Sequence, residues 1–345
     1  MVPVSFLAAV ASVLAFLAGY IPPGRSSLVA FAGLGMPAIL LLNFLIAVYW
    51  IFAKKRWVYI PVAAILLNTG YLLSIFQWSP SAPKQRAGKQ EILLATYNVG
   101  RFNTGQRNAQ LWVAGELRNK EADIVCFQEY YNDSRTNSDS LGRVLGLPYR
   151  VVEYLPGSAT VGSAIFSRYP IVRSARIPFR VTHNDAIWAD IRIGKQIIRV
   201  VSCHLQTTNF SRKRKKLDDP AFRNADFSQI DSTFRDISGE LKKNFEIRAR
   251  QAELVCRLID TTAYPLIVCG DFNDTPSSFA YRQIKGRLKD AFRVCGNGYG
   301  YTYRGIRRLL RIDYVLYSPD MRCLSYSSPD WTYSDHKPVL VTLEL

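Results

Sequence analysis

The first 78 residues of this 345-residue chain contain no Asp, no Glu and no Cys, and only four basic side chains: Arg25, Lys54, Lys55 and Arg56. Ion paths and proton relays across membranes are built from ionisable side chains within the apolar segments. No charge lies inside the apolar runs of this region. The sequence therefore argues against transport and favours an anchoring role for residues 1–78.

Three long apolar runs fill this region: Met1–Ile21, Leu28–Ala53 and Trp57–Trp78. Each reaches the roughly 20 residues with which an α-helix crosses the hydrocarbon core of a bilayer. Aromatic side chains that favour the membrane interface stand near the run ends, namely Trp50, Trp57, Tyr59 and Trp78. A cleaved signal peptide is the alternative for the first run, but no basic residue precedes it and two further runs follow. We predict a multi-pass membrane anchor of three transmembrane helices over residues 1–78.

The charges beside these runs help to predict on which side of the membrane the rest of the chain lies. The basic turn 54–56 prefers the cytoplasm, and with three spans this orientation puts the C-terminal part outside it. Lys84, Arg86 and Lys89 follow the third run and oppose that arrangement. Because large domains translocate largely regardless of charge, we expect an extracytoplasmic domain.

Cysteine is missing before residue 126, and the six later cysteines include no CxxC pair and no other zinc-ligand spacing. A disulfide framework is not expected in a domain this large. Cys126, Cys203 and Cys269 lie within apolar runs and are predicted to be small buried side chains. The cysteines therefore indicate no zinc site and do not decide the cellular compartment.

Acidic residues are outnumbered after residue 78, where all 27 of them stand against 40 basic ones, so this part carries +13 of the total +17. Such an excess attracts polyanions, including nucleic acid and anionic lipid headgroups. Solubility or membrane proximity without specific binding is the alternative, because charge alone reports no site. The densest basic cluster, residues 212–216, lies in a polar insertion at 209–244. This insertion is interpreted as a solvated loop or, alternatively, as a surface for anionic headgroups or a nucleic-acid backbone.

Residues 79–92 are predicted to be a linker, since Ser79 to Gln90 is rich in Pro, Lys and Ser. Strand-like runs dominate the rest of the chain. The predicted strands are 91–98, 123–129, 149–154, 163–167, 186–193, 196–204, 266–269, 311–317 and a terminal strand reaching 343, and the predicted helices are 108–120 and 245–261. This pattern favours a two-layered β core covered by helices.

Polar side chains follow these strands where they end, most clearly in the stretch Leu266–Pro276. Four apolar residues are followed by Gly270, and then by Asp271 and Asn273 two positions apart. In an extended segment these two side chains would point to the same side, and ligands of open α/β sheets bind just beyond strand ends. A carboxylate beside a neutral oxygen ligand suits a hard cation and an activated water. A polar turn is the alternative interpretation.

The same placement recurs at other strand edges: Asn98, Glu129, His204, Asp313, Asp335 and His336. A Glu that emerges from an apolar run requires a partner when it is buried, and a metal ion or an Arg would satisfy it. A single His of this kind more often has a structural role. The recurrence of polar side chains at so many strand edges favours a common site.

Five stretches resemble the endonuclease/exonuclease/phosphatase superfamily (deoxyribonuclease I-like): Thr96–Asn98, Phe127–Glu129, Ser202–Leu205, Gly270–Pro276 and Ser334–His336. Weaker matches are Ser163–Ile171 and Ile312–Leu316. All seven follow the order of the family over about 95–345, and this order carries the resemblance. The whole chain is similar to a membrane-anchored, bacterial-type member, although the three apolar runs lie outside the match.

The resemblance implies a four-layered α/β sandwich, with two packed β-sheets flanked by helices, over residues 93–345. It implies that Glu129 binds Mg²⁺ or Mn²⁺ with the help of Asn98 and Asp335. It assigns catalytic roles to His204, Asp271, Asn273, Asp313 and His336. Asp271 would activate water, Asn273 would hold the phosphate, and Asp313 would position His336 against the phosphoryl oxygens, while His204 would add a donor to the developing charge.

We therefore expect a membrane-anchored, metal-dependent phosphoesterase that hydrolyses phosphodiester or phosphomonoester bonds. A nucleic-acid substrate fits the basic charge and a phospholipid or sphingomyelin headgroup fits the anchor, so both stay open. No protein partner is implied. A non-catalytic membrane binding protein on the same fold is the alternative, but no residue of the expected set is missing.

Overall fold

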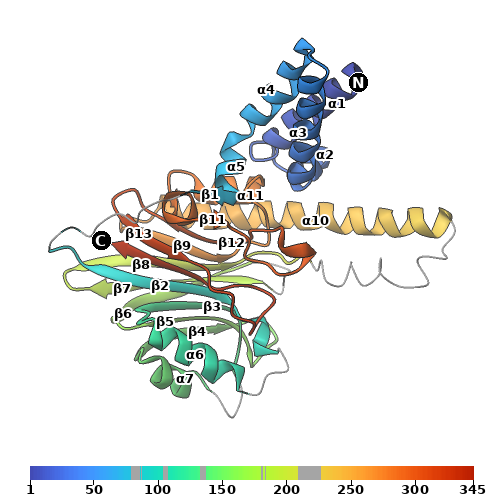
Figure 1. Cartoon of the computed structure of the whole chain (residues 1–345). Coiled ribbons are helices and arrows are strands. Elements are labelled where there is room, and N and C mark those ends of the chain that lie inside the picture. Colours follow the sequence, from blue (N-terminus) through green and yellow to red (C-terminus); the bar gives the residue numbers. More distant parts are fainter. Residues whose placement is uncertain are drawn as a thin grey trace. The chain divides into compact units, whose positions relative to one another are not determined.

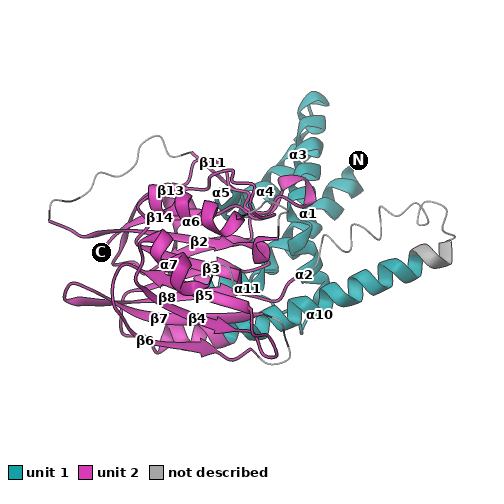
Figure 2. Cartoon of the chain, turned by 90° about the horizontal axis from the view of Figure 1, so that it is seen from below, with its two compact units in different colours: residues 1–75, 208–253, 274–284 teal, residues 76–207, 254–273, 285–345 magenta. Residues whose placement is uncertain are grey.

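The computed structural model describes residues 1–78, 86, 88–103, 108–132, 137–179, 182, 184–208 and 227–345. The chain divides into two compact units, shown in different colours in Figure 2. The first unit comprises residues 1–75, 208–253 and 274–284, and the second comprises residues 76–207, 254–273 and 285–345. The first boundary lies close to residue 78, but the first unit also takes up two segments from the C-terminal part of the chain.

The second unit contains two six-stranded sheets (Figure 1). The first sheet has the strand order β13-β14-β2-β3-β5-β4, and the second has the order β10-β12-β9-β8-β7-β6. The strands of the first sheet are β2 (Glu91–Asn98), β3 (Ile124–Tyr131), β4 (Tyr149–Tyr154), β5 (Val161–Ser167), β13 (Arg322–Ser327) and β14 (Val339–Glu344). Those of the second are β6 (Ile171–Ile177), β7 (Asp185–Ile193), β8 (Gln196–His204), β9 (Leu266–Asp271), β10 (Lys289–Asp290) and β12 (Asp313–Tyr317). Both sheets are mixed, because β2 pairs parallel with β3 and β8 pairs parallel with β9.

The two sheets pack on each other through a buried apolar core that includes Leu94, Cys126, Ile187, Val200 and Val315. A second core lies between the first sheet and the helices α6 (Ala109–Asn119) and α7 (Ser138–Leu145), which Figure 1 shows together beside β4 and β5. Short elements complete the unit: η2 (Gly100–Phe102), α12 (Ala291–Cys295), η3 (Ile306–Arg308), and the small sheet of β1 (Phe76–Gln77) and β11 (Gly298–Tyr299). The predicted α/β architecture of two packed sheets with flanking helices is confirmed.

The strands predicted from apolar runs are present, with ends shifted by a few residues, and the cysteines at 126, 203 and 269 are buried. The strands β6, β10 and β13 were not predicted. β6 and β13 are edge strands with exposed residues, and β10 has only two residues. Edge strands lack the continuous apolar run that marks a buried strand. The predicted linker falls mostly on residues outside the described ranges, and its residues 91 and 92 belong to β2.

The insertion predicted as a loop at 209–244 is largely helical where the structure describes it. Helix α10 runs from Phe227 to Asp260, which extends the predicted helix by 18 residues toward the N-terminus. The prediction missed this part because its residues are mostly polar, whereas helices were sought by apolar spacing. An exposed i,i+4 ion pair at 2.7 Å between Arg235 and Asp231 supports the polar part of the helix. The basic cluster 212–216 lies outside the described residues.

In the first unit, the N-terminal residues form α1 (Val2–Leu17), α2 (Ser27–Leu34), α3 (Met36–Phe52), η1 (Arg56–Val58), α4 (Tyr59–Leu67) and α5 (Thr69–Ile75). No single described helix is both long and apolar enough to cross a membrane. Two bent pairs reach that length and composition, Ser27–Leu34 with Met36–Phe52 at 66° and Arg56–Leu67 with Thr69–Ile75 at 55°. The prediction of three uninterrupted transmembrane helices is therefore not supported.

Local sequence explains both breaks. Pro37 enters α3 in its first turn, where its ring is compatible with a helix start but not with continuation of α2. Asn68 separates α4 from α5, and its buried side-chain amide donates to the carbonyl oxygens of Ala64 and Ser12. A Ser, Thr, Asn or Asp that bonds the backbone in this way competes with regular helix bonding.

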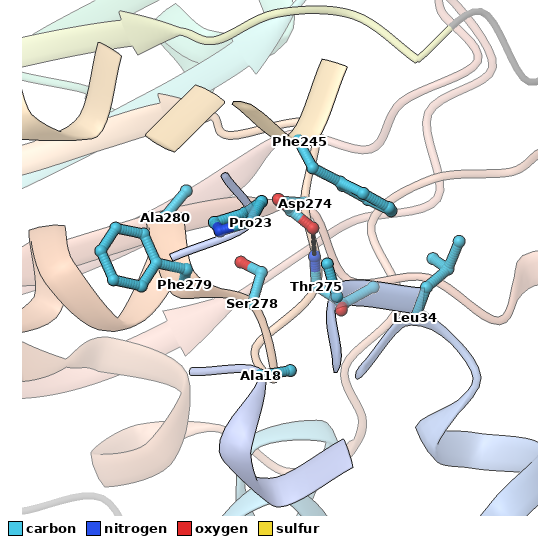
Figure 3. A pocket seen from close by; sticks show the side chains of 10 residues that line it. Ala18, Pro23, Leu34, Phe245, Asp274, Thr275, Ser278, Phe279 and Ala280 are labelled. Atoms are coloured by element: carbon cyan, nitrogen blue, oxygen red, sulfur yellow. Dashed lines mark hydrogen bonds between the residues drawn. The ribbon is translucent and has the colours of Figure 1, made fainter. Parts of the chain in front are cut away.

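The segment Asp274–Ile284 packs inside the first unit. Ser277 Oγ donates to the carbonyl oxygen of Gly33 at 2.8 Å, and the guanidinium of Arg282 lies 3.5 Å from the ring centroid of Tyr20. A cavity of about 10 Å³ remains among these elements (Figure 3). It has room for about one water molecule, so these packed segments leave no space there for a larger ligand.

Candidate active site

Four polar residues lie in register across the second sheet. Asp185 of β7 is opposite His204 of β8, His204 is beside Asp271 of β9, and Asp271 is opposite Asp313 of β12. The sequence places each of them at a strand end, and the register turns these ends into one row. The row contains Asp271 and Asp313, two carboxylates that lie close to the histidines of the site. All four side chains of the row are buried.

A β-bulge in the first sheet brings Glu129 to the site. The pairing of β3 with β5 shifts between Phe127 and Tyr130, and Glu129 has a φ of 49°. A bulge of this kind re-aims a side chain, and a non-glycine residue at positive φ is uncommon. On the neighbouring strand, Asn98 ends β2 opposite Gln128. Glu129 is 28% exposed, so the site is open to solvent on this side.

Asp271 is the centre of the hydrogen-bond network. Its Oδ2 accepts from Asn98 Nδ2 at 2.9 Å and from Asn273 Nδ2 at 3.0 Å. The first bond links the two sheets. Burial raises the pKa of Asp271, while the facing His336 opposes this effect. A buried carboxylate of raised pKa is a stronger base than one in water.

Asn273 reaches Asp271 by a different route from the one expected. The prediction relied on an extended backbone, but β9 ends at Asp271 and Asn273 has a φ of 51°. Its backbone N–H donates to Asp271 Oδ1 at 2.8 Å, and its side-chain amide also donates to the carbonyl oxygen of Leu205. The two side chains meet because of this local turn, to which Asn is well suited.

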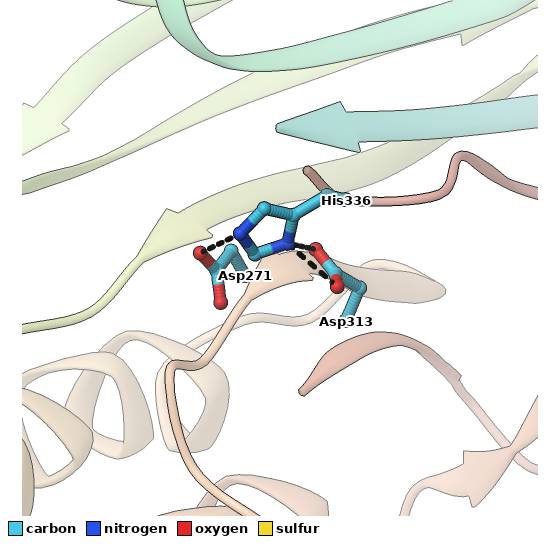
Figure 4. A group of neighbouring side chains, drawn as sticks. All are labelled: Asp271, Asp313 and His336. Carbon is cyan, nitrogen blue, oxygen red and sulfur yellow. Dashed lines mark hydrogen bonds and ion pairs between the residues drawn. The ribbon is translucent and has the colours of Figure 1, made fainter. Parts of the chain in front are cut away.

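His336 lies between two carboxylates (Figure 4). Its Nδ1 is 3.0 Å from Asp313 Oδ2 and 3.2 Å from Oδ1, and its Nε2 is 3.7 Å from Asp271 Oδ2. Burial lowers the pKa of His336, but Asp313 and Asp271 outweigh this and raise it to about 10. The ring of Tyr303 lies against the imidazole, with 5.1 Å between ring centroids. The geometry therefore holds His336 in a fixed orientation as a cation.

His204 is held by residues that the sequence interpretation did not include. Asn184 Nδ2 lies 3.2 Å from His204 Nε2 and also donates to Thr207 Oγ1. The same imidazole nitrogen is 3.7 Å from Glu129 and 3.8 Å from Asp271. The available signal for Asn184 was weak: a polar residue directly before the strand β7, with no apolar run ahead of it.

Gln128 was also missed, although it stands next to Glu129 at the end of an apolar run. Its buried amide donates to Ser202 Oγ at 2.9 Å and to Thr96 Oγ1 at 3.0 Å. Because Thr96 lies in the first sheet and Ser202 in the second, Gln128 links the sheets below the site. Because Gln128 directly precedes Glu129, these bonds help to fix the position of Glu129.

Asp335 lies close to Asn98 through the Ser334 hydroxyl, which donates to the Asn98 carbonyl oxygen at 2.7 Å. Asn98 Oδ1 accepts from the N–H of Gly100, and a Cβ at Gly100 would lie 3.8 Å from Asp335 Oδ1. Asn98, Glu129 and Asp335 thus offer oxygen atoms around the open side of the site. Mg²⁺ and Mn²⁺ prefer oxygen ligands and Mg²⁺ retains several waters, which a partly exposed set of this kind permits.

A different group, Asp271, Asp313 and His336, has ligand atoms that lie within 4.8 Å of one another. This group is fully buried, and its imidazole is already hydrogen-bonded to Asp313. The imidazolium offsets one of its two negative charges, and the Asn98 and Asn273 amides donate to Asp271. We therefore assign it as an acid–histidine chain and place the candidate metal site at the oxygen set.

Two Arg residues of the motif-bearing segments are paired with carboxylates. Arg248 is buried and its Nε lies 2.9 Å from Asp274 Oδ2, while its Nη1 donates to Thr208 Oγ1 at 2.7 Å. Arg168 lies 2.8 Å from Asp123 and is half exposed. Asp274 and Thr208 follow the site residues Asn273 and His204 closely in the chain, so Arg248 ties together the segments that leave the site.

Comparisons with known proteins agree with this fold. The model of the endonuclease/exonuclease/phosphatase family matches residues 95–336, and that of a domain of unknown function (DUF8431) matches residues 1–75. No curated protein matches the sequence.

Solved structures with a similar fold include proteins from three different organisms. An endonuclease/exonuclease/phosphatase from Bacteroides vulgatus has a TM-score of 0.54 and 20% identity, covering 74% of this chain and 100% of that one. The human Nocturnin catalytic domain, with a bound sulfate anion, has a TM-score of 0.54 and 18% identity, covering 73% and 94%. Truncated Caenorhabditis elegans TDP2 has a TM-score of 0.52 and 14% identity, covering 74% and 98%. At these identities the similarity shows the fold alone.

Proposed function

Since the chain belongs to the endonuclease/exonuclease/phosphatase family, we propose that it is a membrane-anchored, divalent-metal-dependent phosphoesterase. It hydrolyses phosphodiester or phosphomonoester bonds by attack of water. The observation that carries this proposal is the convergence of polar side chains from both sheets on Asp271. Asn98 bonds it from the first sheet, and His204, Asn273 and His336 surround it.

The metal ion of this proposal is Mg²⁺ or Mn²⁺, held by Glu129 with Asn98 and Asp335. When bound, it would polarise the scissile phosphate and compensate the charge of the pentavalent state. The fit rests on the oxygen-only donor set and on the exposure of Glu129 and Asp335. These two carboxylates are the only acidic members of the site that are not buried, among the described residues.

The protein's own residues carry the remaining chemistry. Asp271 orients the attacking water and accepts its proton, since its buried carboxylate is held by two amide donors and has a raised pKa. Asn273 and His204 lie next to it. They donate to the phosphoryl oxygens once a bound phosphoester replaces their present partners. His336 presents a positive charge to the developing negative charge, with Asp313 fixing its orientation.

The membrane anchor is proposed for the helices α1 to α5. Large apolar side chains are exposed on them, including Leu7 at 70%, Phe52 at 82% and Leu66 at 66%. An apolar surface of this extent marks contact with protein or membrane, and the absence of acidic residues from 1–78 favours the membrane. The bent pairs would cross as broken helices, and the buried side-chain amide nitrogens of Asn43 and Asn68 find acceptors inside the bundle.

We also propose that the catalytic unit lies on the extracytoplasmic side. The basic turn Lys54–Arg56 separates the two bent pairs and is retained in the cytoplasm by the charge preference of membrane insertion. Protease added to intact cells tests this placement. It should remove the catalytic unit while a cytoplasmic control protein stays whole, and protection of the catalytic unit would reverse the assignment.

The enzymatic proposal is tested with the full-length protein and bis(p-nitrophenyl) phosphate or p-nitrophenyl phosphate, in Mg²⁺, Mn²⁺ or EDTA. We expect metal-dependent release of nitrophenol that is reduced at least about a hundredfold in Glu129→Gln and Asp271→Asn. Asp123→Asn is the matched control, because it changes a carboxylate at the far end of β3. Full activity in Glu129→Gln or in EDTA would rule out the proposed chemistry.

Two substrate classes remain for this chemistry, a nucleic acid and a lipid headgroup. A screen of DNA, RNA, phospholipid and sphingomyelin under the same conditions separates them. Absence of hydrolysis from every phosphoester would favour the alternative of a non-catalytic binding protein on this fold.

A further inference from the structure

The loop Gly298–Leu310 borders the catalytic residues through backbone bonds. The N–H of Arg304 donates to the carbonyl oxygen of Asp335 at 2.8 Å, and the N–H of Lys337 donates to that of Thr302 at 2.7 Å. The Thr302 hydroxyl accepts from the N–H of Asp313 at 3.0 Å. The loop is therefore fixed against both the Asp313 strand and the segment that carries His336. A group bound by the loop would lie beside the site.

The tip of this loop is strained and strongly basic. Ile306, Arg307 and Arg308 have φ values of 45°, 54° and 59°, three successive non-glycine residues in the left-handed region. This conformation is costly for L-residues and worst for a β-branched one such as Ile. It exposes Arg307 and Arg308, and neither forms an ion pair with a carboxylate of the described residues. Strain that persists in this way points to a function of the loop tip.

Apolar and aromatic side chains are exposed beside the two arginines. Leu309 is 47% exposed, Tyr299 is 42% exposed, and the Tyr299 hydroxyl donates to the Leu309 carbonyl oxygen at 2.6 Å. Tyr299 also pairs with Phe76 in the small sheet of β1 and β11. Phe76 and the nearby Trp78 are 52% and 80% exposed. Exposed aromatics together with arginines are typical of the membrane interface.

The chain connects the last apolar helix pair to the strand that pairs with the start of this loop. Phe76 directly follows Ile75, where α5 ends, and Gln77 pairs with Gly298 at the start of the loop. Two extended residues span at most about 7 Å. If α5 ends at the bilayer surface, the start of the loop lies within about one Debye length of the headgroups at physiological salt.

We propose that the loop 298–310 is a headgroup-binding element that rests on the bilayer surface, with Arg307 and Arg308 binding anionic lipid phosphates and Tyr299 and Leu309 in the interface. This proposal depends on the proposed membrane anchor and on the proposed phosphoesterase function. Because the loop borders His336, it presents the site to a phosphoester carried by a lipid at that surface. The substrate class it selects is a membrane phospholipid.

The charge and apolar pattern favours a bilayer over a nucleic-acid strand. A single strand is bound by cations along the backbone and by aromatic rings free to stack with bases. Here one face of Tyr301 is occupied by Lys337, whose Nζ lies 4.4 Å from the ring centroid, and Tyr299 lies 6.1 Å from the same ring. Exposed Leu309 offers nothing to a base or a phosphate, but it suits the boundary between headgroups and acyl chains.

The test is hydrogen exchange of the peptide that covers the loop, measured on the full-length protein in nanodiscs. One set of nanodiscs contains phosphatidylcholine alone, and the other contains 30 mol% phosphatidylglycerol. We expect phosphatidylglycerol to slow exchange of the loop in the wild type. The double variant R307A/R308A should lose this protection, by about fivefold per arginine near an anionic surface, or roughly 25-fold for the pair.

The variant R192A/K195A is the matched control, because it removes two exposed positive charges from the hairpin at the other end of β8 from His204. It should retain the protection. Equal exchange of the loop in both nanodiscs, or equal protection in R307A/R308A and the wild type, overturns the inference. Slower exchange on addition of a 20-nucleotide DNA strand, without an effect of phosphatidylglycerol, overturns it in favour of nucleic acid.

Activity is measured separately, so that the two proposals fail in different ways. Hydrolysis of bis(p-nitrophenyl) phosphate reports the phosphoesterase function and does not depend on lipid charge. Absence of phosphatidylglycerol-dependent protection in the wild type, with normal hydrolysis, refutes the headgroup element alone. Protection without hydrolysis of any phosphoester refutes the enzymatic function and leaves the loop as a membrane contact.

Discussion

Replacing Asp313 by Asn tests the chain of hydrogen bonds and charges from Asp271 through His336. The substitution keeps the shape of the side chain that lies 3.0 Å from His336 Nδ1, but it removes the negative charge. Burial alone lowers the pKa of His336, so the value of about 10 depends on its two carboxylate neighbours. Without Asp313, Asp271 and, to a smaller extent, Asp335 still oppose the effect of burial.

The size of the effect follows from these values. A rise from the usual 6.5 to about 10 corresponds to about 5 kcal/mol in favour of the imidazolium. One opposite charge at this distance typically accounts for about one to three pH units, so we expect the pKa of His336 in Asp313→Asn to be about 8. The substitution would then remove about 3 kcal/mol of this stabilisation.

The sign of the linked stability change is also defined. Because the folded-state pKa of His336 is raised, its contribution is fully present below the unfolded value of about 6.5 and is lost as the pH rises through about 10. The free energy of unfolding of the wild type should therefore fall between about pH 6.5 and 10. In Asp313→Asn the fall should be smaller and should end near pH 8.

The assay is favourable because the chain has only three histidines. Imidazole carbon shifts of ¹³C-histidine-labelled protein are recorded against pH in EDTA, and His336→Asn and His204→Asn assign the signals. Asp123→Asn serves as the control, since Asp123 pairs with Arg168 and does not contact the site. A His336 that titrates near 6.5 in the wild type would refute the reasoning, as would an unchanged titration in Asp313→Asn.

Three further predictions concern the metal, the backbone and the buried ion pair. Glu129→Gln should weaken Mg²⁺ binding at least about tenfold in a calorimetric titration. The melting temperature should not fall, because the Glu129 side chain is partly exposed. Unchanged affinity for Mg²⁺ would exclude Glu129 from the metal site. Gly270→Ala should lower the free energy of unfolding by about 3 kcal/mol or more in denaturant, since a Cβ at φ 120° overlaps the Cys203 carbonyl oxygen. The control Gly239→Ala, on the exposed part of α10, should raise it by about 0.5–1 kcal/mol. Equal effects of the two substitutions would contradict the geometry. Arg248→Met should lower the free energy of unfolding by about 3–5 kcal/mol, because it leaves the buried Asp274 without its cationic partner. Arg235→Ala, in an exposed ion pair, should lower it by less than about 0.5 kcal/mol. A small loss in Arg248→Met would show that the buried pair is not needed for stability.

The sequence predicts the strands of the core well because their signal is local. Leu266–Cys269 and Ile197–Cys203 are apolar runs that can be recognised without knowing their neighbours, and the polar residues that follow them mark the ends of the strands. Pairing β8 with β9 in parallel then brings His204 beside Asp271. The grouping of the site residues was foreseen from this placement and from the family resemblance.

The parts that the sequence did not predict depend on contacts between distant segments. The polar half of α10 has no apolar stripe by which to recognise a helix. The bends at Pro37 and Asn68 interrupt apolar runs that are continuous in the sequence. Asn184 was missed because its role depends on the pairing of β7 with β8, which brings it to His204. None of these relations is encoded in the spacing of residues along one element.

Backbone strain was the least predictable feature, and it is concentrated at the site and its border. Glu129 and Asn273 have positive φ, as do the three residues at the tip of the loop 298–310. Only Asn commonly adopts this conformation without glycine, so the sequence gives no sign of it at Glu129 or Ile306. Hydrogen bonds from neighbouring strands hold the turn, as those of Asn273 to Asp271 and Leu205 illustrate. At the loop tip the arginine side chains point to solvent and form no ion pair with a described carboxylate, and the headgroup of a lipid is the ligand that we propose for them.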